Sequence, residues 1–368
     1  MRIRHRFAAE ANTIPRRCRL AAFLVLTLAA CSGSSAPDAP DPAQWGPYPV
    51  GVTRIELYDA ARDRGMRTQI WYPAAESARG QEPASHASFL PPELASLADN
   101  VSFDIHSVRD AAVAEDGPWP LVLFSHGSGG IRFQNSYECE HLASHGYIVV
   151  APDHQGNTYF DAPAPQEELV TARPLDLLFV LDEVLALSDD PDSRFAGWID
   201  SEMPVGANGM SFGAFTAIVA AGMDDRIAAV QAQVWTGPLA DDFDAATLMM
   251  IASEDKTVGL EGNAAMRETH EDNPGPSILV EVPDAGHFSF SFSCHVGIGI
   301  GIGDGCGSGV RYADGSTFDF IESMEVWELT QTYGTAFFGR YLKGIEAYED
   351  VLASNIAPEI ATHTSDLD

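Results

Sequence analysis

Alternating apolar and polar positions mark the start of the folded part of the chain. Residues 53–58 (Thr-Arg-Ile-Glu-Leu-Tyr) and 67–72 (Arg-Thr-Gln-Ile-Trp-Tyr) both alternate, and Asp63-Arg64-Gly65 between them favours a turn. Alternation with period two is typical of a strand that is buried on one face. The pattern therefore predicts an antiparallel hairpin here, followed by a long irregular stretch over residues 74–118.

Continuous apolar runs of strand length follow, and segments of helical periodicity separate some of them. Such runs are typical of strands covered on both faces of a sheet. Strands are expected at 121–124, 147–151, 205–207, 229–232, 248–251 and 278–282, and helices at 133–145, 174–187 and 325–342. Pro174 suits the first turn of its helix. The alternation predicts the α/β class, with a mostly parallel, doubly wound central sheet and helices on both faces.

The first 30 residues have the pattern of an export signal. Arg16, Arg17 and Arg19 precede an apolar run over residues 20–30, which is too short to span a bilayer as a mature helix. Leu28-Ala29-Ala30-Cys31 resembles the lipobox of bacterial lipoproteins, in which the cysteine is lipidated after cleavage. An ordinary secretory signal or a core helix are the alternatives.

These observations predict three regions. Residues 1–30 are a lipoprotein signal peptide, residues 31–45 a small, Pro-rich flexible tether, and residues 46–368 the folded α/β domain. The protein is then exported and anchored to a membrane through lipid on Cys31. By resemblance to other lipoproteins, Ser32 after the cysteine favours the outer membrane; the pattern leaves open which face the domain occupies.

The chain is strongly acidic. Its 368 residues carry 21 Lys and Arg against 53 Asp and Glu, a net charge of −32. Residues 1–30 hold six arginines and one acid, so their removal would change the net charge to −37. A surface with this charge repels nucleic acid and anionic lipid. It suits a salty exterior, where salt screens the repulsion, but an ordinary soluble acidic protein has the same character. Nucleic acid is therefore not an expected partner; the oligomeric state is not indicated.

Five cysteines occur, and their spacing argues against a metal site because no Cys-x-x-Cys pair is present. Cys18 lies within the signal segment and Cys31 is the expected lipidation site. An exported protein can keep disulfides. Cys294 and Cys306 flank a glycine-rich loop, Gly297 to Gly303, and are the expected disulfide pair. Cys139 is then an unpaired buried thiol.

A serine in a glycine-flanked turn is the expected nucleophile. Gly209-Met210-Ser211-Phe212-Gly213 follows the strand at 205–207 and precedes a helix rich in small residues. A sharp strand-to-helix turn needs little bulk at the two glycines and exposes the serine hydroxyl above the sheet. The alternative is a structural turn. The flanking strand and helix favour the nucleophile.

A base and an acid follow Ser211 in the chain order of such sites. His287 comes just beyond the strand at 278–282, where a base is expected, although a capping or core histidine has the same sequence. Asp255 follows the strand at 248–251 and is the expected acid, with the adjacent Glu254 as the alternative. An acid here would hold the imidazole tautomer and stabilise the imidazolium.

The loop after the first long strand, Phe124-Ser125-His126-Gly127-Ser128, can aim a backbone N–H at a developing oxyanion. We expect Ser128 to supply this N–H and Phe212 the second. His126 is then a structural histidine, as are His154 and Asn157 on a neighbouring loop. Aromatic residues near the site, Trp235, Phe288, Phe290 and Phe292, could line an acyl pocket or belong to the core.

Several motifs together resemble one family. They are Gly46-Pro47-Tyr48-Pro49-Val50-Gly51, Ile70-Trp71-Tyr72-Pro73, Phe124-Ser125-His126-Gly127, Ala151-Pro152-Asp153-His154-Gln155-Gly156-Asn157, Arg173-Pro174-Leu175-Asp176, the turn at Ser211 and Tyr341-Leu342-Lys343-Gly344. The chain thereby resembles, over residues 46–350, the platelet-activating-factor acetylhydrolase-like group of α/β-hydrolases, whose members are often labelled predicted dienelactone hydrolases. True dienelactone hydrolases use cysteine as nucleophile, which Ser211 does not match.

The resemblance implies an α/β-hydrolase fold and a serine carboxylic-ester hydrolase that works through a Ser-His-Asp triad and an acyl-enzyme. It implies no metal or organic cofactor, and a small ester or lipid as substrate. Alternatives within the class are a phospholipid acetylhydrolase and a polyester hydrolase, although Phe215 departs from the small residues usual in the latter. A non-catalytic binding protein on a hydrolase scaffold is the alternative from a different class.

Overall fold

The computed structural model describes residues 39–90, 92–297 and 299–367. The predicted signal peptide, lipidation at Cys31 and the tether as far as residue 38 lie outside the described residues. Residues 39–45 are part of the compact unit that begins at Ala39. The His141 Nε2–H donates to the carbonyl oxygen of Pro42 (3.0 Å), and the Tyr348 hydroxyl donates to that of Pro40 (2.7 Å). The domain thus starts before residue 46, and the end of the predicted tether is packed against it.

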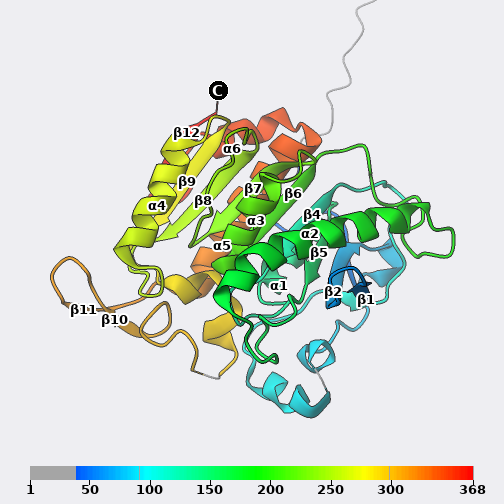
Figure 1. Ribbon diagram of the computed structural model, residues 1–368, viewed down its shortest axis with the longest axis horizontal. Helices are drawn as coiled ribbons and strands as arrows, with labels where there is room; N and C mark the ends of the chain where they lie inside the picture. The colour runs from blue at the N-terminus through cyan, green and yellow to red at the C-terminus, as the bar shows by residue number, and fades with distance from the viewer. Residues whose placement is uncertain (1–38, 91, 298, 368) are drawn as a thin grey trace, which may run out of the picture. The chain divides into compact units, whose positions relative to one another are not determined.

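A ten-stranded sheet forms the centre of the domain, in the order β12-β9-β8-β7-β6-β4-β5-β2-β1-β3 (Figure 1). The strands are β1 Val50–Asp59, β2 Arg64–Pro73, β3 Val108–Arg109, β4 Leu121–Ser125, β5 Ile148–Pro152, β6 Val205–Met210, β7 Ile227–Gln233, β8 Ala246–Ala252, β9 Ser277–Val282 and β12 Thr362–Asp366. The pairing is parallel between each two successive strands in the series β5, β4, β6, β7, β8 and β9. The β1–β2 hairpin joins antiparallel to β5, as the alternating pattern predicts.

Helices cover both faces of the sheet and enclose two apolar cores. The helices are α1 Ser136–Ser144, α2 Gln166–Asp189, α3 Phe212–Ala221, α4 Gly259–Asp272, α5 Ser323–Lys343 and α6 Glu349–Leu352. Side chains of α2, α3 and α4 pack on one face, which is turned toward the viewer in Figure 1. Side chains of α1 and α5 pack on the other. The predicted α/β architecture, with strands buried on both faces, is confirmed.

Two parts of the predicted architecture were wrong. Helix α2 begins at Gln166, so Pro174 lies inside it and not in its first turn. Tertiary contacts hold the helix on both sides of this proline, since Arg62 donates to the carbonyl oxygens of Ala172 and Leu175. Strand β12, which pairs antiparallel with β9, was not predicted. Its sequence, Thr-His-Thr-Ser-Asp, is polar because it is an edge strand.

Residues 74–118 contain the 3₁₀ helices Glu76–Ala78, His86–Phe89 and Pro92–Asn100 as well as β3, and a two-stranded ribbon, β10 (Ser308–Val310) with β11 (Thr317–Asp319), follows the glycine-rich loop. Among the helices of the described ranges, none combines the length and apolar character needed to cross a bilayer.

Candidate active site

Ser211 occupies a strained turn between β6 and α3. Its φ of 57° and ψ of −124° lie in a region that side-chain-bearing residues rarely adopt. The turn is tight: a Cβ on Gly209 would overlap the backbone of Gly213, and one on Gly213 would overlap the carbonyl of Ser125. The two glycines therefore allow the chain to reverse so closely that the Ser211 hydroxyl projects beyond the sheet.

His287 and Asp255 reach Ser211 from two further loops at the same edge of the sheet. His287 Nε2 lies 2.8 Å from Ser211 Oγ, and His287 Nδ1 lies 2.7 Å from Asp255 Oδ2. Asp255 is fully buried and His287 almost so. The other carboxylate oxygen, Oδ1, accepts the backbone N–H groups of Thr257 and Val258, each at 2.8 Å. A fixed carboxylate that accepts from Nδ1–H leaves Nε2 free to accept the serine proton.

Glu254, the alternative acid, points elsewhere. Its Oε2 accepts from Lys256 Nζ (2.9 Å) and from the backbone N–H of Tyr312 (3.0 Å). The structure brings Asp255, not Glu254, to the imidazole.

The expected oxyanion donors flank the same point. Ser128 follows β4, and a Cβ on the adjacent Gly127 would contact that of Ser211. In the described part of the chain, the backbone N–H groups of Ser128 and Phe212 donate to no protein acceptor. Two unpaired donors beside a serine hydroxyl are the arrangement that stabilises a tetrahedral oxyanion.

His126 serves the loop and is not a second base. Its Nδ1–H donates to the carbonyl of Gly127 (2.7 Å), and its Nε2 accepts the backbone N–H of His154 (3.2 Å). Burial, followed by the positive charge of Arg173, holds the pKa of His126 well below its usual value. The imidazole is therefore neutral, with both nitrogens engaged.

A second Ser-His-Asp arrangement lies beneath the loop. Ser125 Oγ is 2.9 Å from His154 Nε2, and His154 Nδ1 is 3.1 Å from Asp176 Oδ2. All three side chains are fully buried and Ser125 does not reach the cavity described below. Burial lowers the pKa of His154 to about 4. This group joins β4, β5 and α2, and a substrate has no access to its serine.

Arg173 holds this buried group to the oxyanion loop. Its guanidinium donates to Ser125 Oγ (2.9 Å), to Asn157 Oδ1 (2.5 Å) and to the carbonyl oxygen of His126, and it lies 4.6 Å from the centre of the Phe212 ring. One buried cation therefore contacts both segments that carry the expected oxyanion donors.

Replacing Arg173 with methionine should lower the free energy of unfolding by about 3 kcal/mol, because buried acceptors on His126 and Asn157 lose a charged donor. Urea unfolding measures this change. Arg54→Met is a suitable control: Arg54 is an exposed arginine that pairs with Glu56 (3.5 Å), so its loss should cost less than about 1 kcal/mol. Equal stability of the two variants would contradict this role of Arg173.

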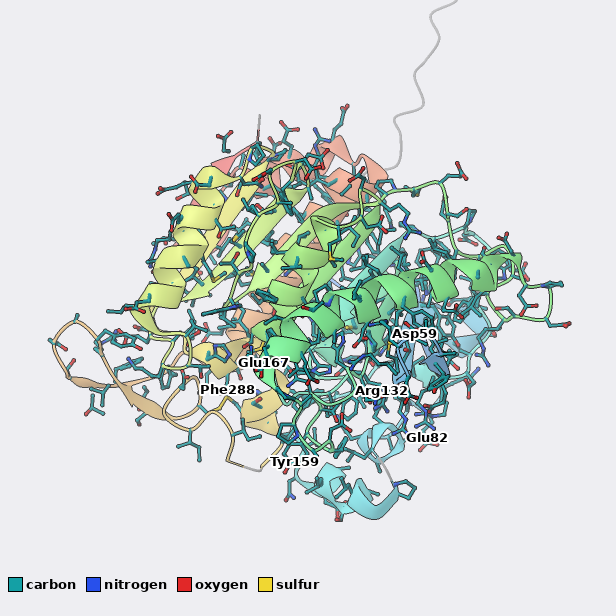
Figure 2. The ribbon with its side chains drawn as sticks, viewed as in Figure 1. Asp59, Glu82, Arg132, Tyr159, Glu167 and Phe288 are labelled. Atoms are coloured by element: carbon teal, nitrogen blue, oxygen red, sulfur yellow. A yellow bond between two sulfur atoms is a disulfide. The ribbon has the colours of Figure 1, made fainter. Side chains whose placement is uncertain are left out.

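The Ser211 hydroxyl opens onto an apolar cavity of about 270 Å³. Phe288 and Tyr159 line it, and both are labelled in the lower half of Figure 2, below the sheet. Its other apolar lining residues come mainly from the 3₁₀ segments and the loops after β4 and β9: Phe89, Leu90, Leu97, Val101, Phe103, Ile105, Ile131, Phe133, Phe160, Met210, Phe292, Val296 and Ile300. No Asp, Glu, Lys or Arg is among the described residues that line the cavity.

Of the four aromatic residues considered from the sequence, Phe288 and Phe292 line this cavity. Phe290, the last residue of the 3₁₀ helix His287–Phe290, is instead buried in the core. Trp235 lies at a different pocket with Phe215 and Leu239.

A buried carboxyl lies behind the nucleophile. Glu138 on α1 accepts from Gln233 Nε2 (2.8 Å), and Gln233 accepts the Ser211 N–H through its carbonyl oxygen (2.8 Å). Burial raises the pKa of Glu138 to about 7. Between its unfolded pKa near 4.5 and about 7, the folded state binds the proton more tightly than the unfolded state, so stability falls as pH rises.

The variant Glu138→Gln should therefore remove part of this fall. Unfolding free energies measured in urea at pH 5 and pH 8 should differ by about 2 kcal/mol less in the variant than in the wild type. Identical pH dependence of the two proteins would show that Glu138 is ionised throughout.

The cysteines pair as expected. Cys294 and Cys306 form a disulfide, and Cys139 is a free, buried thiol. Within the described ranges, no group of three or more His, Cys, Asp or Glu side chains is arranged to hold a metal ion.

The order of the strands, the helices on both faces and the turn at Ser211 define an α/β-hydrolase fold. A solved structure agrees: the chain matches a ferulic acid esterase from Streptomyces cinnamoneus with a TM-score of 0.68 at 24% identity, over 86% of this chain and 96% of that one. The predicted fold class is confirmed.

Sequence comparisons give the family resemblance. Residues 35–172 match the family model of platelet-activating factor acetylhydrolase, isoform II. The platelet-activating factor acetylhydrolase of Cavia porcellus is 31% identical over 139 residues, 33% of this chain and 31% of that protein. A putative phospholipase A2 of Schizosaccharomyces pombe is 28% identical over 145 residues, 32% of this chain and 33% of that protein. The predicted resemblance is confirmed over residues 35–172, a shorter span than the expected 46–350, and the matches to these relatives span about a third of their length.

Sequence reasoning missed the roles of Arg173 and Asp176, which entered only as part of a family motif. The sequence holds one signal for them: this charged pair lies in a helix whose other residues on the same side, such as Leu177 and Leu181, are apolar and buried. It also missed Asp304, an acid inside a glycine run between two cysteines, whose backbone and side-chain contacts reach the Ser211 site.

Proposed function

We propose that the protein is a serine carboxylic-ester hydrolase whose triad is Ser211, His287 and Asp255. The observation that carries the proposal is the unbroken chain of short contacts from Asp255 Oδ2 through the imidazole to Ser211 Oγ, at the wall of an apolar cavity. The resemblance to acetylhydrolases supports the same reaction class.

Each catalytic step uses a group whose position is given above. His287 Nε2 accepts the proton as Ser211 Oγ attacks the ester carbonyl, and the Ser128 and Phe212 N–H groups donate to the oxyanion. The imidazolium then protonates the leaving alcohol, which leaves an acyl group on Ser211. Water, deprotonated by His287, attacks this acyl-enzyme; the bond from the acyl carbon to Ser211 Oγ breaks, the imidazolium returns the proton to Oγ, and the acid is released. No metal or organic cofactor enters these steps.

The substrate class follows from the cavity. Its lining is mainly aromatic and aliphatic, with no Asp, Glu, Lys or Arg among the described residues, so it suits a neutral apolar group of the ester. A phospholipid acetylhydrolase is the favoured alternative, since the relatives are named for lipid substrates. A polyester hydrolase and a non-catalytic binding protein remain the other outcomes of the test.

Hydrolysis of nitrophenyl esters from acetyl to dodecanoyl tests this proposal. KM should fall about fourfold for each methylene that the cavity buries, until the cavity is full. Acetyl-phospholipid and polyester oligomers should be assayed beside them, to show which ester gives the highest kcat/KM. Absence of hydrolysis of every ester, together with absence of labelling by a fluorophosphonate, would favour the binding protein.

We also propose that the protein is exported and held at the outer membrane by lipid on Cys31, as the sequence around that residue indicates. Metabolic labelling with palmitate should mark the wild-type protein and not Cys31→Ser. Equal labelling of the wild type and Cys31→Ser would contradict lipidation at Cys31.

A further inference from the structure

The glycine-rich loop between the two bonded cysteines returns to the Ser211 site. Cys294 and Cys306 close a loop that contains Gly297 to Gly305, and Asp304 is the one acidic residue between them. Asp304 is only 9% exposed although its neighbours on both sides are glycines. A carboxylate that is nearly buried needs hydrogen-bond donors, and the residues that donate to Asp304 indicate its role.

The donors to Asp304 come from the two loops that carry the proposed base and acid. Its Oδ1 accepts the backbone N–H of His287 (2.9 Å) and that of Lys256 (2.8 Å), and its Oδ2 accepts the Thr257 hydroxyl (2.8 Å). Its carbonyl oxygen accepts the N–H of Phe288 (2.9 Å). One residue thus links the loop after β8 to the loop after β9.

These contacts close a ring through the proposed triad. Thr257, which Asp304 holds through its hydroxyl, donates its own N–H to Asp255 Oδ1 (2.8 Å). Asp255 Oδ2 contacts the His287 imidazole, and the His287 backbone returns to Asp304. Asp304 therefore fixes the separation between acid and base at both of its ends, in addition to the direct backbone bond from the Glu254 N–H to the Ala285 carbonyl oxygen (3.0 Å).

The end of the loop at Asp304 and Gly305 is packed closely against residues 286–289. A Cβ on Gly286 would overlap the backbone of Asp304 and Gly305, and a Cβ on Gly305 would overlap that of Ser289. Only glycine at both positions allows the two backbones to meet. The disulfide closes this loop beside the contact.

We propose that Asp304 is a positioning residue, held by the disulfide-closed loop, that sets the distance between Asp255 and His287. The proposal rests on the proposed function of the triad. It assigns the glycine-rich loop a role in catalysis: the loop acts through the backbone of the base and the loop of the acid, and it contributes no group to the reacting atoms.

Kinetics of Asp304→Ala and Asp304→Asn test the proposal with the full-length protein and a nitrophenyl ester. Asp304→Ala should lower kcat about 100-fold, the loss expected from a displacement of about 1 Å. KM should change less than kcat, because Asp304 itself does not line the cavity. Asp304→Asn keeps an oxygen that can accept both backbone N–H groups and should recover most of kcat. The downfield proton signal of His287 Nδ1–H, seen by NMR, should weaken in the alanine variant and persist in the asparagine variant.

Three controls make the result decisive. Asp314→Ala removes an exposed acid that caps only its own turn at Ser316, and it should leave kcat unchanged. The pair Cys294→Ser and Cys306→Ser opens the loop with Asp304 intact and should lower kcat; KM should rise as well, because Val296 and Ile300 of this loop line the cavity. This variant also serves if the alanine variant does not fold. Ser211→Ala tests the proposed function separately, since its activity is lost only if Ser211 is the nucleophile.

Folded Asp304→Ala with kcat within twofold of the wild type would overturn the proposal. So would a cysteine-pair variant with wild-type kcat, if the alanine variant does not fold. An asparagine variant as impaired as the alanine variant would show that the charge acts and not the hydrogen-bonded geometry, which also overturns it.

Discussion

Ser211→Ala should lower kcat for a short nitrophenyl ester by about 10⁶-fold, the loss seen when the nucleophile of a serine triad is removed. The variant keeps the cavity, the imidazole and the oxyanion donors, so substrate binding should persist while acyl transfer to the enzyme stops. The strained backbone at residue 211 also suits alanine no worse than serine, so the fold should be retained.

Ser125→Ala is the matched control, because the chain offers two Ser-His-Asp arrangements. Ser125 contacts His154 as Ser211 contacts His287, yet it is fully buried. Its loss should reduce stability and leave kcat within about tenfold, since it supports the oxyanion loop only from below. Activity that survives in Ser211→Ala and is lost in Ser125→Ala would reverse the assignment of the nucleophile.

Asp255→Asn should lower kcat by about 10⁴-fold. The amide can present its NH₂ group to His287 Nδ1, which would hold the proton on Nε2 and so block the base. Because Asp255 Oδ2 lies 2.7 Å from His287 Nδ1, the amide of the variant would act on this nitrogen directly. Assays that are stopped at fixed times, at several enzyme concentrations, measure the residual rate of ester hydrolysis.

Glu254→Gln is the control for that substitution. Glu254 pairs with Lys256 and the N–H of Tyr312, so its amide should change kcat by less than about tenfold. A larger loss in Glu254→Gln than in Asp255→Asn would assign the acid to Glu254.

Much of the fold could be predicted because the buried strands are continuous apolar runs. The central strands β4, β5, β8 and β9 carry their own signal in the sequence, and so does the alternating β1–β2 hairpin. The polar edge strand β12 carries none, since its stability comes from pairing with β9.

The start of α2 shows a different limit. Pro174 is a common first-turn residue, so local preference placed the helix start there. Contacts from Arg62 on the β1–β2 hairpin hold the helix across this proline, and no local pattern encodes them.

The proposed triad could be predicted from chain order and position, because parallel strands bring their carboxyl ends to one edge of the sheet. Ser211, Asp255 and His287 follow β6, β8 and β9 in that order. The residues that support the triad were harder to predict, since Arg173 and Asp304 act through contacts between segments far apart in the chain. Neither a helix pattern nor a glycine run shows which loop such a residue will meet.

Mass spectrometry of the protein after reaction with a fluorophosphonate tests most directly whether Ser211 is the nucleophile. One phosphonyl adduct is expected, located on Ser211, with rapid labelling of the wild type and none of Ser211→Ala. His287→Ala should label far more slowly, because the serine loses its base. An adduct on Ser125, or an unlabelled wild-type protein that is nevertheless folded, would contradict the assignment of Ser211 as the nucleophile.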